Sequence, residues 1–561
     1  EHITGVVVHS DMKPTGSWKS SEPLLNQLYH NIVWGQKGNF LDVPTDCPQR
    51  DERLGWTGDA QVFAPTAALN MDVSGFFSKW TRDIALDQKS NGSVPHVIPD
   101  VLDETSHGTA GWADAATVIP WAMYQAYGDK KMLERQLPSM ISWVDYVSTK
   151  VDDDLIWRPG FQFGDWLSPQ FQDVFSPYRA VTGVDIIATA YFAHSAHLVS
   201  QAADVLGMKN EARKYQNLFE QARKAFQEEF VTASGRLSYE TQTAYVLALA
   251  FELLPESQRM DAAARLSADV KVRGNHLTTG FLGTPELTRV LSDYGQIETA
   301  YDLLTQTTYP SWLYPVTFGA TTIWERWDAI RPDGTFQSPE MTSFNHYAYG
   351  AIGEWMVETV AGLKADPAFP AYKRLLIQPR PGGGLLHAKT TLDTPYGATA
   401  SSWSFEGDKF TLEVTVAPNT TARVILPLAA GLRITENSAP LQGVAGILKS
   451  QEKGRDRYVD VGSGTYSFSY HAKELLIQAV NFAPFTEASS LADILSDPIG
   501  KTAVETHLPE FNLQQVPSQF QTAAIVDLLA YSPVKEPFQA LINAFPKINE
   551  ARRAAIFATP E

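Results

Sequence analysis

The highest density of ionisable side chains in the sequence lies in residues 42–59, DVPTDCPQRDERLGWTGD. These 18 residues include five carboxylates and two arginines, interrupted by two prolines and two glycines, which predicts an ordered loop and not a regular helix. Closely spaced carboxylates can give and take protons, the chemistry of general acid–base catalysis. A solvated loop held by salt bridges is the alternative. Leu54 and Trp56 indicate partial burial, and buried carboxylates are costly without a partner or a function.

A second carboxylate lies between two indoles. In residues 321–328, TTIWERWD, Glu325 directly follows Trp324 and stands two positions before Trp327. Burial beside indole rings raises the pKa of a carboxyl group, which is one way to hold a catalytic acid or base near neutrality. The alternative is a glutamate at a helix start that pairs with Arg326.

Two smaller groups add candidates. Residues 163–166, FGDW, join the carboxylate of Asp165 to the indole of Trp166, and residues 343–347, SFNHY, place His346 before a predicted helix. A histidine in that position is more often packed than functional. Thirteen of the 14 tryptophans lie between Trp18 and Trp355, which suits either a large core or a site that stacks partly apolar ligands such as sugar rings.

The composition and the absence of several motifs exclude a number of function classes. The balance of 45 Lys and Arg against 63 Asp and Glu gives a net charge of −18, a poor match for nucleic acid or anionic lipid surfaces, and no apolar run is long enough for a membrane helix. Nucleotide-binding, zinc-protease and serine-hydrolase signatures are absent. Separated carboxylates among tryptophans remain, and glycoside cleavage needs such a pair, one to protonate the leaving oxygen and one to activate water or attack.

The elements that must position these residues are mainly helical over residues 21–365. An apolar stripe at helical spacing runs through Tyr215, Leu218, Phe219, Ala222 and Phe226, whereas residues 186–205 are apolar around more of their circumference. This contrast predicts an outer and an inner layer of about a dozen helices. A closed double ring of six helical hairpins fits, and an α-solenoid is the alternative.

The apolar period changes to two after residue 365. Alternation in residues 410–416, with a hairpin turn at residues 406–408, predicts an antiparallel β-sandwich over residues 366–480. Residues 481–561 return to a helical period and predict a small helical appendage, with helices at 489–495, 499–507, 516–529 and 537–545. Residues 1–20 form a linker in which 3–8 look like a strand that pairs with the sandwich or is the remnant of a preceding β-domain.

Residues 42–61, with HLTTG at 276–280, YPSWLYP at 309–315, GATTIWERWD at 319–328 and NHY at 345–347, resemble the bacterial α-L-rhamnosidase family of glycoside hydrolases. The resemblance covers roughly residues 15 to 475, and the run CPQRDERLGWTGDAQ is long enough to be highly specific. It implies a multi-domain, mainly α protein in which an (α/α)6 barrel precedes a β-sandwich. Members usually carry β-domains before the barrel, where residues 1–20 stand here.

The resemblance also implies an inverting mechanism that releases terminal α-L-rhamnose. Glu52 matches the family's general acid and Glu325 its general base. Pocket positions of the family fall on a larger set, namely Asp46, Arg50, Trp56, Asp59, Trp112, Asp165, Trp166 and His346. Trp324, which directly precedes Glu325, is a further substrate-binding candidate. Inversion requires carboxyl groups roughly 6.5 to 9.5 Å apart, whereas retention requires about 5 Å.

Several alternatives stay open at this point. The scaffold also suits another exo-glycosidase with a different terminal sugar, or a sugar-binding relative without activity. Rhamnose-containing glycosides or oligosaccharides are the expected partners, and no cofactor or metal is expected, although scattered carboxylates leave room for a structural calcium. Cys47 is the single cysteine, which excludes an intramolecular disulfide. The single cysteine and the absence of a signal pattern in residues 1–16 favour a soluble cytoplasmic protein. The sequence does not indicate the oligomeric state.

Overall fold

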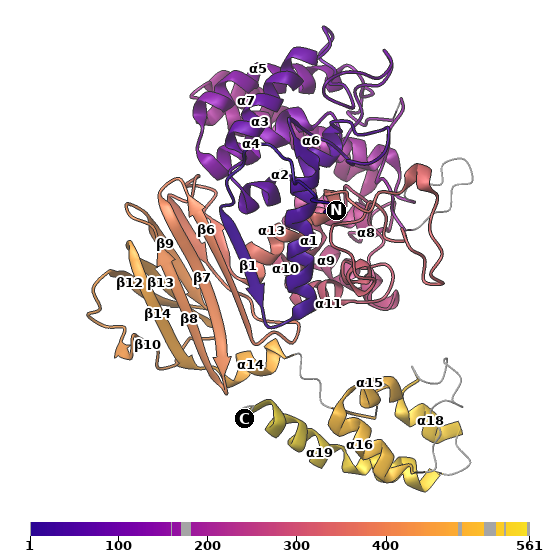
Figure 1. Ribbon diagram of the computed structural model, residues 1–561, viewed down its shortest axis with the longest axis vertical. Helices are drawn as coiled ribbons and strands as arrows, with labels where there is room; N and C mark the ends of the chain where they lie inside the picture. Colours follow the sequence, from indigo (N-terminus) through magenta and orange to yellow (C-terminus); the bar gives the residue numbers. More distant parts are fainter. Residues whose placement is uncertain are drawn as a thin grey trace. The chain divides into compact units, whose positions relative to one another are not determined.

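The chain forms two compact units, shown in Figure 1 as a computed structural model that describes residues 2–158, 160–169, 181–480, 485–487, 489–509, 523–531 and 535–557. The first unit comprises Glu1–Ser404 and Thr411–Ser469, and the second comprises Phe405–Phe410 and Tyr470–Glu561. The candidate site residues all belong to the first unit.

The helical part of the first unit follows the predicted division into amphipathic and almost fully buried helices. Its α-helices are α1 (Pro23–Asn39), α2 (Thr57–Asn70), α3 (Ser74–Asp87), α4 (Ala115–Tyr127), α5 (Lys130–Ser148), α6 (Val184–Val205), α7 (Lys209–Phe230), α8 (Gln242–Ala250), α9 (Glu256–Val272), α10 (Thr284–Asp293), α11 (Ile297–Thr305), α12 (Leu313–Thr317) and α13 (Ile352–Trp355), with short turns η1 (Pro339–Met341), η2 (Ala348–Ala351) and η3 (Met356–Val360). No helix of the described residues is long and apolar enough to cross a membrane.

Sequence signals explain where helices begin and which face they bury. Pro23 opens α1 and the Glu22 side chain accepts a hydrogen bond from the Leu24 N–H, which caps the helix as the sequence predicts. Helix α7 buries only one stripe, whereas α6, packed beside it, is buried around most of its circumference. The predicted outer and inner layers are therefore present in this pair.

The inner helices contact one another in a closed circuit. Contacts lead from α2 to α4, α6, α8 and α10, then to η2 and α13, and from these back to α2. The loops before α2, before α4 and before η2 therefore open on the same end of the circuit. This arrangement can bring segments that are far apart in the sequence to one site.

Two sheets follow the helices in the first unit, as the change of period predicts (Figure 1). The seven-stranded sheet has the order β1-β6-β7-β8-β14-β10-β11 and the five-stranded sheet the order β12-β13-β9-β5-β4; residues 40–44 add the small pair β2 and β3. The strands are β1 (Gly16–Ser20), β2 (Phe40–Leu41), β3 (Val43–Pro44), β4 (Leu363–Ala365), β5 (Arg374–Ile377), β6 (His387–Thr394), β7 (Gly397–Glu406), β8 (Lys409–Val416), β9 (Thr421–Leu426), β10 (Thr435–Glu436), β11 (Ala439–Pro440), β12 (Ile447–Lys453), β13 (Asp456–Val461) and β14 (Gly464–His471). The predicted hairpin between β7 and β8 is confirmed.

Two strand predictions need correction. Residues 3–8 form no strand and expose Ile3, Val6, Val7 and Val8; β1 instead joins the sheet, antiparallel to β6. Its Trp18 is buried and donates to the Met356 carbonyl (2.8 Å), an anchor that the apolar run at 3–8 lacks. The sandwich is also not wholly antiparallel, because β5 and β9 run parallel after an intervening excursion through the other sheet.

The second unit contains the short helices α14 (Lys473–Ala479), α15 (Leu491–Ser496), α16 (Pro498–His507) and α18 (Ile525–Tyr531) and the longer helix α19 (Lys535–Phe557). Apolar side chains including Leu491, Ile494, Ile525 and Leu541 form its own core. The predicted helix at 516–529 is present from Ile525, and its residues 516–522 lie outside the described ranges. The predicted sandwich range ends too late, because α14 occupies part of it.

Candidate active site

A narrow cleft in the helical part gathers most of the candidate residues, and we call it the carboxylate cleft. Its walls come from the loop between β3 and α2, the start of α2, the loops before α4 and α6, and the segment 320–347. The lining residues are Asp46, Glu52, Trp56, Asp59, Trp112, Phe163, Trp166, Phe281, Glu325, Met341 and His346.

Backbone contacts fix the loop that carries the first carboxylates. The Leu54 N–H donates to Asp46 Oδ1 (2.9 Å) and the Asp46 N–H to the Leu54 carbonyl (3.0 Å). A Cβ at Gly55 would lie 2.1 Å from the Ile98 carbonyl oxygen, and one at Gly58 would lie 2.6 Å from the Trp112 ring. Both glycines are required for these close approaches, so the predicted ordered loop is confirmed.

Arg50 joins the two candidate catalytic carboxylates. Its Nη1 and Nη2 donate to Glu325 (2.7 and 3.0 Å), and its Nε donates to Glu52 (2.9 Å) while Nη2 also donates to Glu52. Arg50 and Glu325 are 275 positions apart in the sequence. One guanidinium therefore bridges the two chain segments with charge-assisted hydrogen bonds.

The environment of Glu325 keeps this buried carboxylate ionised. The residue is 3% exposed, and burial alone would raise the pKa of its carboxyl group. Arg50, the positive field of His346 and the Ser343 N–H, which donates to Glu325 Oε2 (2.7 Å), outweigh burial and hold the pKa of Glu325 below its ordinary value. Its ion partner is Arg50, whereas Arg326 pairs with Asp328.

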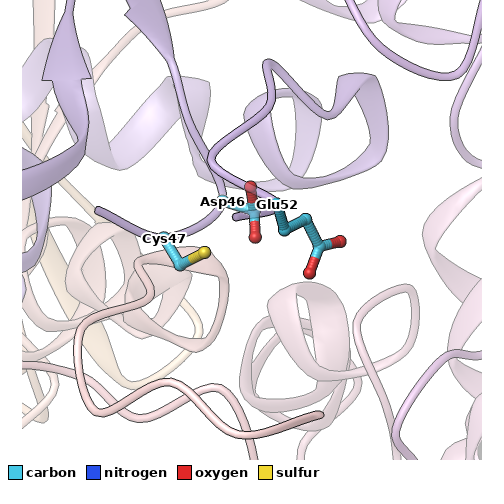
Figure 2. Close-up of side chains that lie close together, drawn as sticks. All are labelled: Asp46, Cys47 and Glu52. Carbon is cyan, nitrogen blue, oxygen red and sulfur yellow. The ribbon is translucent and has the colours of Figure 1, made fainter. Parts of the chain in front are cut away.

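The environment of Asp46 shifts its pKa in the opposite direction, upward. Burial and the nearby charge of Glu52 raise the pKa of Asp46 to about 7. Figure 2 shows the Asp46 carboxylate between the side chains of Cys47 and Glu52. Burial and the Asp46 charge raise the pKa of the fully buried Cys47 thiol to about 12. Asp46 Oδ2 accepts no hydrogen bond from a described residue, so one acceptor remains for a ligand hydroxyl.

His346 and Asp59 form a buried pair on another side of the cleft. His346 Nε2 lies 3.0 Å from Asp59 Oδ1, and both side chains are almost completely buried. Burial opposes the charged imidazole, but the bond to Asp59 and the charges of Glu325 and Asp46 prevail and raise the pKa of His346. The sequence-based preference for a merely packed histidine does not describe this geometry.

Aromatic rings form the remaining wall, and Phe163 lies at their centre. Its ring centroid lies 4.5 Å from that of Trp112, 5.8 Å from Trp56 and 5.7 Å from Trp166. Trp56 Nε1 is buried without a partner among the described residues. This wall offers apolar ring faces and one donor to a ligand.

Three lining residues were missed by sequence reasoning. Phe163 stands in the FGDW group, from which only the polar and indole residues were selected, and Phe281 directly follows the HLTTG stretch. Both signals were present in the sequence. Met341 follows no motif, and only its position beside the cleft identifies it.

Three predicted pocket residues are not among the lining residues, and of these only Arg50 bonds to carboxylates of the cleft. Asp165 is fully buried and accepts hydrogen bonds from the Gly280, Leu282 and Gly283 N–H groups and from Thr243, so it connects chain segments. Trp324 packs in a separate cluster with Tyr314, Ala320 and Ala329. Trp327 stacks on Tyr349 instead of on Glu325 (centroids 4.0 Å apart). The prediction of a carboxylate wedged between two indoles is therefore wrong, because adjacent side chains leave an irregular segment in different directions.

One group of side chains in the described part of the chain has the spacing of metal ligands. Single ligand atoms of Asp46, Cys47 and Glu52 lie within 4.8 Å of one another (Figure 2). Calcium prefers oxygen ligands, so a set that contains a thiol does not suit it. The Arg50 guanidinium already contacts both carboxylates, and the protein itself thus supplies positive charge there.

The helical part and the sheet part of the first unit each match a domain of a known protein family. The bacterial alpha-L-rhamnosidase 6 hairpin glycosidase domain matches residues 13–360, and the bacterial alpha-L-rhamnosidase C-terminal domain matches residues 362–439. An alpha-L-rhamnosidase of Streptomyces avermitilis is 45% identical over 83% of this chain and 43% of its own length; one of Formosa agariphila is 44% identical over 78% of this chain and 46% of its own. The chain thus spans less than half the length of these curated relatives.

A solved structure agrees with these matches. The crystal structure of Streptomyces avermitilis alpha-L-rhamnosidase complexed with L-rhamnose superposes with a TM-score of 0.76 at 44% identity, covering 82% of this chain and 42% of that one. The mainly helical architecture with sheets in the C-terminal region is shared. The match of the hairpin glycosidase domain to more than half of the sequence shows that the chain belongs to the bacterial alpha-L-rhamnosidase family.

Proposed function

We propose that this chain hydrolyses terminal, non-reducing α-L-rhamnose from rhamnose-containing glycosides or oligosaccharides, with inversion at the anomeric carbon. The observation that carries a glycosidase site is the bridge through Arg50, which brings Glu52 and Glu325 to one cleft from distant segments. Because both carboxylates accept from Arg50 Nη2, their oxygens lie closer together in the bridge than inversion requires, so inversion itself rests on the family resemblance. The family membership and the L-rhamnose complex of a relative support the choice of sugar.

In this mechanism Glu52 donates a proton to the glycosidic oxygen and Glu325 takes a proton from water on the opposite face of the ring. The direction of the Glu325 pKa suits a base, because a lowered pKa keeps the carboxylate ionised at neutral pH. Glu52 is the more accessible of the two, with 29% of its side chain exposed against 4% for Glu325. An acid that serves varied leaving groups belongs at the open side of a site.

Substrate binding requires the bridge to open. The free volume of the cleft is about 50 Å³, which holds a few water molecules but no hexose. We infer that Arg50 leaves Glu52 when the sugar enters and keeps its bonds to Glu325. The acceptor Asp46 Oδ2 and the Asp59–His346 pair then receive sugar hydroxyls, while Trp56 and its aromatic neighbours contact the C6 methyl group.

The scaffold of this activity is an (α/α)6 barrel in our proposal. The closed circuit of inner helices from α2 through α4, α6, α8, α10 and α13 supports this arrangement over an α-solenoid, which would leave its first and last helices apart. The loops that carry the carboxylates precede inner helices, so ring closure itself assembles the cleft.

The decisive experiment is release of L-rhamnose from a nitrophenyl α-L-rhamnoside, with proton NMR of the first-formed anomer. Inversion predicts β-L-rhamnose as the initial product, and initial formation of the α anomer would refute the mechanism. Turnover of a different nitrophenyl glycoside instead would favour another exo-glycosidase. Rhamnose binding in calorimetry without any turnover would favour a non-catalytic sugar-binding protein.

A further inference from the structure

A second, larger hollow lies in the helical part of the first unit, and we call it the basal cavity. It consists of two adjoining spaces of about 740 and 520 Å³, within the usual range of ligand pockets. Both spaces are lined by Trp121 and Gln125 of α4, Gln201 of α6, Gln216 of α7, and Glu354 and Glu358 near α13.

The basal cavity is separate from the carboxylate cleft. The two lining sets share no residue. Helix α2 begins at the cleft with Asp59 and reaches the cavity with Ala68, nine residues or about 13 Å further along its axis. Helix α4 likewise follows Trp112 of the cleft and brings Gln125 to the cavity. The same helices therefore connect two sites at their opposite ends.

Polar groups in the cavity have hydrogen-bonding capacity that the protein does not use. No described residue bonds to the carboxylate of Glu354, to the side-chain amides of Gln125 and Gln201, or to the indole N–H of Trp121. Beside them, Glu358 pairs with Lys364 (3.0 Å). The turn η3, which carries Glu358, is a π-helix, a rare form that occurs frequently at functional sites.

The chemistry of these groups selects a class of ligand. Five acidic side chains and four cations line the two spaces, and three of the cations are already paired: Lys209 with Asp204, Arg223 with Glu220 and Lys364 with Glu358. The remaining excess of negative charge disfavours an anion. Burial and the charges of Glu358 and Glu286 raise the pKa of Glu354, which lowers the negative charge that this carboxyl group offers to a cation. An apolar wall of Pro65, Ala68 and Leu69 completes a surface suited to a molecule with hydroxyl groups and apolar faces.

We propose that the basal cavity binds a neutral polyhydroxylated ligand, a mono- or short oligosaccharide, as a site distinct from the carboxylate cleft. Trp121 offers its ring to one sugar face, and Gln125, Gln201 and Glu354 bond to hydroxyls. This site does not depend on the reaction that the cleft performs.

The test uses the full chain labelled with 5-fluorotryptophan and followed by fluorine NMR. Trp121→Phe and Trp56→Phe assign one resonance to the cavity and one to the cleft. L-rhamnose, D-glucose, D-galactose and cellobiose are titrated to millimolar concentrations. At least one sugar should shift the Trp121 resonance in a saturable manner, with or without a response of Trp56, so cavity binding and cleft binding are read separately.

Matched variants locate the binding. Gln125→Met and Gln201→Met keep side-chain volume and remove the amide, and each should weaken binding at Trp121 roughly 2- to 10-fold. Ala122→Phe fills the cavity and should abolish it. Gln221→Met, an equal exchange on the exposed face of α7, should leave it unchanged. Thermal unfolding and rhamnoside turnover of each variant verify that the fold and the cleft are intact.

Three results would overturn the proposal. The first is a Trp121 resonance that no sugar moves. The second is a shift that Gln201→Met and Ala122→Phe leave unaltered. The third is a response of Trp121 to calcium or magnesium ions alone, which would identify a cation site. If the proposed hydrolytic function is wrong, the chain should not turn over the rhamnoside and L-rhamnose should not shift the Trp56 resonance.

Discussion

Replacing Arg50 by Met should move the acid limb of the pH profile of kcat/KM to higher pH. Arg50 donates two hydrogen bonds to the buried carboxylate of Glu325, 2.7 and 3.0 Å long. Without them, burial is opposed only by the Ser343 N–H and by His346, so the pKa of Glu325 rises. A base works only when it is ionised, so the proposed activity should then begin only at a higher pH.

The size of this shift follows from the bonds that are lost. Hydrogen bonds to a charged group contribute about 1.5–3 kcal/mol, and one pH unit corresponds to about 1.36 kcal/mol. Arg50 donates two such bonds to Glu325, so the acid limb should move upward by about two to four units. Arg50→Lys keeps the charge but loses the two-pronged geometry, and its shift should be intermediate.

The assay is hydrolysis of a nitrophenyl α-L-rhamnoside from about pH 4 to about pH 9, with kcat/KM fitted at each pH. Arg53→Met is the matched control, because it removes the same charge from the same loop while Arg53 pairs only with the fully exposed Asp51. It should move the limb by no more than a few tenths of a unit. An unmoved limb in Arg50→Met, or an equal shift in both variants, would refute the assigned role of Arg50.

Four further outcomes are expected. Glu52→Gln should lower kcat/KM by roughly 10²- to 10⁴-fold for rhamnosides with poor leaving groups and much less for nitrophenyl rhamnoside; equal losses would contradict its role as the acid. Glu325→Gln should lose hydrolysis, and added azide should give the inverted glycosyl azide by product NMR, whereas a retained product would exclude inversion. Asp46 has a folded-state pKa raised to about 7, so the wild type should lose stability as pH rises from about 4 to about 7. Asp46→Asn keeps the acceptor for the Leu54 N–H and should avoid this loss, on the order of 4 kcal/mol, of which about 3 kcal/mol falls between about pH 5 and about pH 8; urea unfolding at those two pH values measures that part, and parallel stabilities would count against the buried acid. Cys47 should not react with a thiol reagent near pH 8 until the chain unfolds, since the thiol is fully buried with a pKa of about 12; rapid labelling of the native protein would disagree.

Local sequence patterns predicted much of the fold because they act over a few residues. The Glu22–Pro23 start of α1, the mostly buried α6 beside the striped α7, and the β7–β8 hairpin all follow from capping, periodicity and turn residues. The prediction of a strand at residues 3–8 was wrong because it rested on a local apolar run alone. Such a run forms a strand only where it also meets a sheet edge and has a side chain that anchors it. Trp18 of β1 provides that anchor from a less apolar segment.

For the candidate site, too, the sequence predicted some features and not others. The dense motif at residues 42–59 and the WERW segment supplied Glu52, Asp46, Trp56 and Glu325, because ionisable groups among indoles are visible in the sequence itself. The direction in which each side chain points is not visible. Asp165 therefore proved to connect backbone segments, and Trp324 proved to pack away from the cleft.

The sequence by itself determined the chemical groups, the helical and strand periods and the family resemblance, since each depends on residue types at short spacing. Only the tertiary structure decided the partners of those groups. Arg50 meets Glu325, and Asp59 meets His346, because the inner helices close into a circuit that brings loops more than 270 positions apart to one end. The pKa values of the site follow from those partners and from burial, so the difference between the lowered pKa of Glu325 and the raised pKa of Asp46 is a property of the folded chain.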